Sequence, residues 1–240
     1  MPPPCRAQGL AEGYENKMEW IKQFWHLIST PEGLQTLIGW GGLPVLALIV
    51  FAETGLLIGF FLPGDSLLFV AGFLASPAGE KIMGDHQFSI FWLNVVLIIA
   101  AIVGDTVGYW IGHKAGPPIF NRPQSRFFRR DYLLRAHEFY ERHGGKTIVL
   151  ARFIPIIRTF APVVAGAASM NYRHFVAYNV FGGIGWVVSM TLLGYYLGQI
   201  PWVQQNLEKA VLIVILLSIS PMFVHAWQEW RRKRSANKSS

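Results

Sequence analysis

Two apolar stretches of the chain carry ionisable residues and are each interrupted by proline and glycine. Glu53 and Asp65 belong to the first stretch, and Arg152 and Arg158 belong to the second. A charged side chain at the centre of a bilayer costs about 2.5 to 3.5 kcal/mol on insertion scales, so intramembrane charges usually face a protected cavity and mark the path of a substrate or ion. No other feature of the sequence constrains the fold as strongly, and it predicts a transport site inside a membrane.

The composition is that of a polytopic membrane protein. Of the 240 residues, 52% are hydrophobic and 15% are charged, and at this length the apolar segments form one compact helical bundle without a large second domain. The formal net charge is +7, but the basic residues cluster in loops, where they orient the chain in the membrane, and we expect no nucleic-acid partner. The single cysteine, Cys5, excludes an internal disulfide and a thiolate metal cluster.

The expected fold is an all-α membrane protein that combines spanning helices with two re-entrant helical hairpins. Length and hydropathy predict spanning helices over residues 37–52, 88–112, 175–198 and 211–227. The hairpins are expected at about 54–75, broken at Pro63 and Gly64, and at about 148–169, broken at Pro155 and Pro162. As a helix, the arm 54–62 would measure about 13 Å against about 30 Å of hydrocarbon, so it reaches only half way. Irregular backbone at that depth must be covered by protein or line a cavity.

Three parts of the chain are expected along the sequence. They are a polar tail with an interfacial amphipathic helix at 1–30, a transmembrane domain at 31–229 and a basic tail at 230–240. The interfacial helix is predicted at 18–28, and an amphipathic surface helix is predicted at 131–143. Residues 1–17 lack the basic and apolar regions of a secretory leader. Translation could start at either Met1 or Met18.

Basic residues predict the orientation in the membrane. The polar loop 113–147 and the tail 230–240 are rich in Lys and Arg, which places both of them, and the C-terminus, in the cytoplasm. Counting crossings back from the tail puts residues 199–205 on the opposite side. The first hairpin then opens to the periplasm and the second to the cytoplasm, so that the two breaks face each other.

An internal repeat supports two facing hairpins. Phe61-Leu62-Pro63 and Val70-Ala71-Gly72 resemble Phe153-Ile154-Pro155 and Val164-Ala165-Gly166, and Gly108-Tyr109-Trp110-Ile111-Gly112 resembles Gly194-Tyr195-Tyr196-Leu197-Gly198. The glycines of the last pair are typical of close helix packing. Two oppositely oriented copies around broken helices are a recurring design of secondary transporters, with the site near the midplane where the copies meet. The sequence therefore predicts an inverted repeat and alternating access.

The charged residues predict a division of roles. A guanidinium offers a planar fork of donors that matches phosphate oxygens and stays charged at any working pH, so Arg152 and Arg158 suit a lipid phosphate head group. Glu53 and Asp65 suit protons, because binding and release of an anion beside them can switch their protonation. Asp105 either joins this proton path or bonds a neighbouring helix. The alternative is that the charges form buried ion pairs that only hold the hairpins together.

Other chemistries lack the residues that they need. The seven histidines show no ligand spacing on a common buried face, and the chain contains no nucleophile motif and no phosphate-binding loop. Trp and Tyr near the ends of the spans are typical of interfacial anchors. We expect no catalytic residue, no metal and no cofactor, and therefore no enzymatic activity.

Long motifs in both halves carry a family resemblance. They are Glu53-Thr54-Gly55, Phe61-Leu62-Pro63-Gly64-Asp65-Ser66, Gly104-Asp105, His143-Gly144-Gly145-Lys146-Thr147 and the run from Ala151 to Pro162. From about Trp40 to the C-terminus the chain resembles the DedA family of bacterial inner-membrane proteins, whose domain is shared with eukaryotic lipid scramblases. The resemblance implies a bacterial inner-membrane location and recycling of undecaprenyl phosphate, with the proton motive force implicated. It also implies that Glu53, Asp65, Arg152 and Arg158 are needed for function.

The expected function is transport of a lipid phosphate, with undecaprenyl phosphate as the first choice, linked to the proton motive force. The partners would be this lipid, protons and the surrounding membrane lipids, and self-association is left open. Three alternatives stand beside it: phospholipid scrambling, proton or cation antiport in support of envelope homeostasis, and hydrolysis of lipid phosphates. Antiport would make the arginines dispensable, and hydrolysis would need a nucleophile or a metal beside them.

Overall fold

The computed structural model describes residues 31–56, 64–83, 88–120, 149, 152, 155–217 and 220. All regular structure in these ranges is helical: α2 (Pro31–Gly55), α3 (Gly64–Leu74), α4 (Pro77–Met83), α5 (Ile90–Phe120), α8 (Pro155–Ala167), α9 (Tyr172–Leu197), α10 (Pro201–Gln205) and a further helix over 207–217. Within the described ranges, three segments are long and apolar enough to cross a membrane: Ile38–Gly55, Ile90–Gly116 and Tyr172–Leu197. The expectation of an all-α, multi-pass membrane protein is therefore confirmed. The predicted helices at 18–28 and 131–143 and the end of the last predicted span, 221–227, lie outside the described residues.

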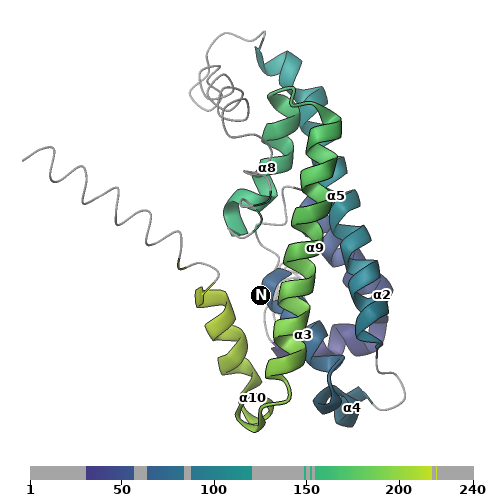
Figure 1. Ribbon diagram of the computed structural model, residues 1–240, viewed down its shortest axis with the longest axis vertical. Coiled ribbons are helices and arrows are strands. Elements are labelled where there is room, and N and C mark those ends of the chain that lie inside the picture. Colours follow the sequence, from purple (N-terminus) through teal and green to yellow (C-terminus); the bar gives the residue numbers. More distant parts are fainter. Residues whose placement is uncertain are drawn as a thin grey trace, which may run out of the picture.

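Helices α5 and α9 form the long axis of the molecule and run in opposite directions (Figure 1). Near one end, the Thr191 hydroxyl donates to the Asn94 side-chain oxygen over 2.8 Å. Near the other end, the rings of Tyr109 and Phe175 stack with their centroids 4.6 Å apart. Side chains on the outward faces of both helices are largely apolar and exposed, as expected where a helix meets lipid.

The expected polar loop after residue 112 begins later than predicted, because α5 continues to Phe120. The extra turns are covered by α8: a Cβ added to Gly116 would lie 2.8 Å from the carbonyl oxygen of Ala167. His113 and Lys114 are exposed on these turns. Helix packing on one side thus extends the helix past residues that hydropathy assigns to a loop.

Helices α3 and α8 start close together in the middle of the molecule and run toward opposite ends. Along α3, Asp65 bonds Trp186 and the later residue Gly72 packs on Thr191, so α3 follows α9 toward its C-terminal end. Helix α8 ends where Gly166 packs on Tyr109, so it follows the C-terminal half of α5. Figure 1 shows α8 beside one half of the α5 and α9 pair and α3 beside the other half.

The first predicted hairpin differs from the structure in its first arm. The expected arm 54–62 is not a helix of its own, because residues 54 and 55 end α2, and 57–63 lie outside the described residues. A further interruption lies earlier, at Gly42, whose backbone has φ +57° and ψ −151°, a conformation that side-chain-bearing residues rarely adopt. Hydropathy ends the first predicted span at residue 52, but Glu53 pairs with Arg158 and α2 continues to Gly55.

The segment of α2 after Gly42 runs alongside the first half of α5. At its start, a Cβ added to Gly42 would lie 3.8 Å from the ring of Phe88, just before α5 begins. At its end, Gly55 packs against the backbone of Gly104, near the middle of α5. This segment therefore ends at the level where α3 begins.

The proline and glycine positions predicted as breaks have different outcomes. Gly64 is the first residue of α3 and Pro155 is the first residue of α8, where a missing N–H costs nothing. Pro63 lies outside the described residues. Pro162 is inside α8, so the helix is not broken there, contrary to the prediction. Its ring faces Gly108, whose lack of a side chain leaves room for it: a Cβ there would lie 3.4 Å from the ring.

Four glycines make two matching helix crossings. Each lies where a Cβ would overlap a backbone carbonyl oxygen of the facing helix: Gly72 against Thr191, Gly194 against Phe69, Gly166 against Tyr109 and Gly112 against Val163. The first two join α3 to α9, and the last two join α8 to α5. Gly194 thus corresponds in packing to Gly112, whereas the sequence comparison aligned it with Gly108, one helical turn away. Because the glycines recur four residues apart in both segments, the sequence alone does not show which of them correspond.

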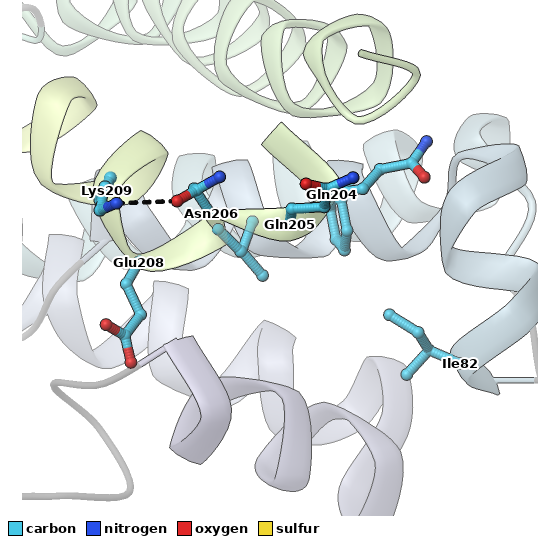
Figure 2. Close-up of a pocket in the computed structure, with 8 residues that line it drawn as sticks. Ile82, Gln204, Gln205, Asn206, Glu208 and Lys209 are labelled. Carbon is cyan, nitrogen blue, oxygen red and sulfur yellow. Dashed lines mark hydrogen bonds between the residues drawn. The ribbon is translucent and has the colours of Figure 1, made fainter. Parts of the chain in front are cut away.

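A pocket of about 380 Å³ lies at the end of the molecule that carries α4 and α10, and residues of both helices line it (Figure 2). It is lined by Phe73, Ile82, Gln204, Gln205, Asn206, Leu207, Glu208 and Lys209. Lys209 donates to the side-chain oxygen of Asn206 over 2.8 Å at its edge. From Asp65 to Phe73 the α3 axis rises by about 12 Å, so this pocket is distant from the buried charges.

The glycine crossings predict a position-specific cost on α9. Gly194→Ala should lower the stability of the folded protein by about 1 to 3 kcal/mol, because its methyl group overlaps the Phe69 carbonyl. Gly185→Ala, on the same helix with nothing within 4 Å, should be neutral or slightly stabilising, because alanine favours helix. Unfolding in detergent by heat or denaturant measures both. Equal effects of the two variants would contradict the close crossing.

The arrangement also predicts which residues face the same side of the membrane. In a Cys5→Ser background, single cysteines replacing Lys81 and Gln205 should react with a membrane-impermeant thiol reagent from the periplasm, because both are exposed at the end that carries α4 and α10, which the distribution of basic residues predicts to be periplasmic. A cysteine replacing exposed Lys114, at the other end of α5, should react only after the cells are opened. Labelling of Lys81 and Lys114 positions from one side would contradict the crossing by α5.

Candidate functional site

Arg158 is the centre of a buried charged cluster, formed with Glu53, Asp65 and Trp186. Its side chain is 7% exposed. One terminal nitrogen, Nη2, donates to Oε1 of Glu53, and the other, Nη1, donates to Oδ1 of Asp65 over 2.5 Å. The three charged residues come from α2, α3 and α8, so this central cluster joins the end of one helix to the starts of two others.

Trp186 completes the central cluster from α9. Its indole Nε1 donates to Oδ1 of Asp65 over 2.8 Å, and the guanidinium carbon of Arg158 lies 4.5 Å from the centre of its ring. A guanidinium above an indole face is a favourable cation–π arrangement, more so where water is excluded. The same side chain therefore contacts both the cation and one of its carboxylates.

Glu53 lies against the first residue of α3. A Cβ added to Gly64 would overlap the Glu53 carboxylate, so any side chain at this position would displace it. Glycine at the hairpin break thus serves the site directly, by leaving room for an acidic group at the positive end of a helix.

Arg152 forms a second buried cluster, with Asp105 and Asn179. Its Nη2 donates to a carboxylate oxygen of Asp105 and to the side-chain oxygen of Asn179. The Asn179 side-chain nitrogen donates in turn to the carbonyl oxygen of Ile102 over 3.1 Å, which fixes the amide between α5 and α9. Asp105 lies near the middle of the Ile90–Gly116 span and pairs with an arginine.

Two glycines of α9 give Arg152 the room that it occupies. Gly182 and Gly183 lie between Asn179 and Trp186 along the helix. A Cβ on Gly182 would lie 2.9 Å from Cδ of Arg152, and one on Gly183 would lie 3.2 Å from its Nη1. The guanidinium therefore lies on nearly bare helix backbone, and both arginines contact the same helix, α9.

Three polar atoms of these clusters have no hydrogen-bond partner within the part of the chain that the structure describes. They are Oε2 of Glu53, Nε of Arg152 and Nε of Arg158, and all three are buried. An unsatisfied buried polar group is costly, more so when it is charged. Each such atom calls for an explanation, and a bound water, an ion or another ligand would provide one.

The predicted site residues thus fall into two groups. Glu53, Asp65 and Arg158 are brought together, whereas Arg152 pairs with Asp105. Asn179 and Trp186 are not among the predicted residues, because tryptophan in a membrane protein usually indicates an interfacial anchor. A signal was present: an amide and an indole about two turns apart on one face of an apolar helix, with two glycines between them.

Comparison with known proteins identifies the family. The model of the VTT domain matches residues 62–196. Protein DedA of Escherichia coli (strain K12) is 50% identical over 196 residues, which cover 82% of this chain and 85% of the relative. Uncharacterized membrane protein Rv0364 of Mycobacterium tuberculosis (strain ATCC 25618 / H37Rv) is 40% identical over 208 residues, covering 86% and 88% of the two chains.

A more distant relative covers the same region. Inner membrane protein YqjA of Escherichia coli (strain K12) is 33% identical over 175 residues, which cover 73% of this chain and 76% of the relative. No solved structure matches the chain. The domain match and the identities over most of both chains agree with the motifs of the two halves, and the chain therefore belongs to the DedA family of VTT-domain membrane proteins.

Proposed function

We propose that this protein moves a lipid phosphate, with undecaprenyl phosphate as the first choice, across the bacterial inner membrane, and that the movement is linked to the proton motive force. The observation that carries the proposal is a pair of buried arginines, each with an Nε donor that has no partner among the described residues. A relative named as an inner membrane protein supports the location.

The head group would bind to the arginines. A phosphate accepts parallel hydrogen bonds from the planar fork of a guanidinium, and such charge-assisted bonds are the strong ones. Arg158 and Arg152 each present an Nε donor that has no partner among the described residues, from two clusters that both contact α9. The bare backbone at Gly182 and Gly183 lets the Arg152 side chain lie against α9, where a larger residue would displace it.

The carboxylates would compete with the phosphate for the same donors. Glu53 and Asp65 occupy both terminal nitrogens of Arg158, so an anion can take them only if the carboxylates withdraw or are neutralised. A protonated carboxyl group no longer forms an ion pair with the guanidinium. Proton uptake and head-group binding therefore favour each other. This competition would link transport to protons, with Asp105 in the same role beside Arg152.

Two facing re-entrant hairpins would carry the conformational change. The segment of α2 after Gly42 and helix α3 would be the two arms of the first, because both reach the central cluster and the first follows only half of α5. Helix α8 would be one arm of the second. Helices that begin at a midplane site point their positive ends at an anionic substrate, as in many transporters with inverted repeats. The C-terminus would lie in the cytoplasm.

The direct test uses purified protein in vesicles that contain labelled undecaprenyl phosphate. The label should move between leaflets without release of inorganic phosphate, and an imposed pH gradient should change the rate. Release of phosphate would indicate hydrolysis, equal movement of ordinary phospholipids would indicate scrambling, and a proton flux without movement of lipid would indicate antiport. Each of these three results would contradict the proposal.

The arginine fork generates one prediction. Arg158→Lys keeps the charge but loses the planar pair of donors, so transport of the lipid phosphate should fall at least tenfold, the change expected from loss of about one charged hydrogen bond. The protein should still insert, and Arg173→Lys, at an exposed position of α9, is the matched control. Comparing the transport defect of Arg152→Lys with that of Arg158→Lys shows which arginine contributes more. Full activity of Arg158→Lys would contradict a bidentate role.

Proton coupling generates another prediction. Glu53→Gln and Asp65→Asn should insert normally yet lose the response of transport to an imposed pH gradient, because a neutral amide cannot exchange a proton. Glu80→Gln, on the exposed surface of α4, should keep the response. Initial transport rates at matched and opposed gradients give the readout. A double variant of Glu53 and Asp65 that retains gradient-driven transport at the wild-type rate would rule out coupling through these groups.

A further inference from the structure

The two carboxylates that bind Arg158 have different surroundings. Oδ1 of Asp65 accepts two hydrogen bonds, one from Nη1 of Arg158 over 2.5 Å and one from the indole of Trp186 over 2.8 Å. Oε1 of Glu53 accepts from Arg158, while its Oε2 has no partner in the described ranges. If Arg158 turned away from both, Asp65 would keep the indole donor of Trp186, and Oε1 of Glu53 would lose the hydrogen bond that it accepts from Arg158.

Trp186 lies where it can stabilise Asp65 when Arg158 turns away. It is 1% exposed and lies near the middle of α9. Its N–H points at Asp65 and its ring face supports the guanidinium 4.5 Å away. A buried carboxylate without a partner is strongly unfavourable, so a second donor on Asp65 lowers the cost of removing Arg158 from it.

We propose that Trp186 is a positioning residue for the exchange of anions at Arg158: its indole N–H holds Asp65 in place while Arg158 transfers its donors to a phosphate group. The inference rests on the proposed function for the identity of that anion. Asp65 would stay bonded to Trp186 during the exchange, and Glu53 would be the carboxylate that moves away from Arg158 when the phosphate binds. Trp186 would not touch the phosphate, and its effect would pass through Asp65 and Arg158.

The substitution Trp186→Phe separates the two contacts of the indole, because it keeps an aromatic face under Arg158 and removes the N–H. In vesicles with labelled undecaprenyl phosphate, the apparent KM should rise about tenfold, which corresponds to loss of one hydrogen bond to a charged group, with the maximal rate changed much less. Trp186→His, which retains a ring N–H, should lie closer to the wild type. Trp40→Phe, at a position 85% exposed, is the control and should change neither value. An unchanged apparent KM in Trp186→Phe, or a fall in maximal rate alone, would overturn the inference.

A second measurement needs no substrate and stands apart from the proposed function. In protein labelled with ¹⁵N-tryptophan, the indole N–H of Trp186, assigned by its loss in Trp186→Phe or Trp186→His, should stay protected from solvent exchange in Arg158→Gln. It should lose protection in Asp65→Ala. Loss of protection in Arg158→Gln would overturn the inference, because Trp186 would then depend on Arg158 and could not hold Asp65 without it. A wild type that moves no lipid phosphate would instead refute the proposed function, and the exchange measurement would still decide whether Trp186 holds Asp65.

Discussion

The pairing of buried arginines with carboxylates is the interaction on which the rest of the structure depends. Arg158 can lie inside an apolar bundle because Glu53, Asp65 and Trp186 surround it, and Arg152 can do so because of Asp105 and Asn179. Removing one partner of a buried pair leaves an uncompensated charge and typically costs about 3 to 5 kcal/mol. The segments that supply these residues, from α2 to α9, must therefore meet at the same depth, and this requirement fixes where α2 ends and where α3 and α8 begin.

The glycines make that meeting geometrically feasible. Gly64 leaves room for the Glu53 carboxylate, and Gly182 and Gly183 leave room for Arg152 on the surface of α9. At the crossings, Gly194 and Gly112 bring α3 and α8 into backbone contact with the long helices. Small residues at helix interfaces are the common device in membranes, where burial of apolar surface gives no drive for helices to associate. Charge pairing and close packing thus act together, since neither would place the ionisable groups without the other.

Much of this could be predicted from the sequence, because charge in an apolar segment has few explanations. The helical membrane class and the meeting of Glu53, Asp65 and Arg158 follow from that scarcity. The breaks predicted at Gly64 and Pro155 coincide with the starts of α3 and α8, because glycine and proline interrupt helices but are tolerated where one begins. Helix ends could not be predicted, since hydropathy treats Glu53 as a boundary while the structure neutralises it inside α2. The same holds for Pro162, which a bare Gly108 accommodates inside α8. The role of Trp186 was hidden because its partners come from two other helices, and no local pattern in α9 specifies them.

The central claim is that the intramembrane arginines bind a phosphate head group. The most direct measurement is the dipolar coupling, by solid-state NMR, between the phosphorus of undecaprenyl phosphate and ¹⁵N-labelled arginine side chains in protein embedded in bilayers. Charge-assisted hydrogen bonds would place a guanidinium nitrogen within about 4 Å of phosphorus, so the account predicts a strong coupling. It also predicts that the coupling disappears in a variant with lysine at both Arg152 and Arg158. A coupling that survives in that variant, or none in the wild type, would contradict the account.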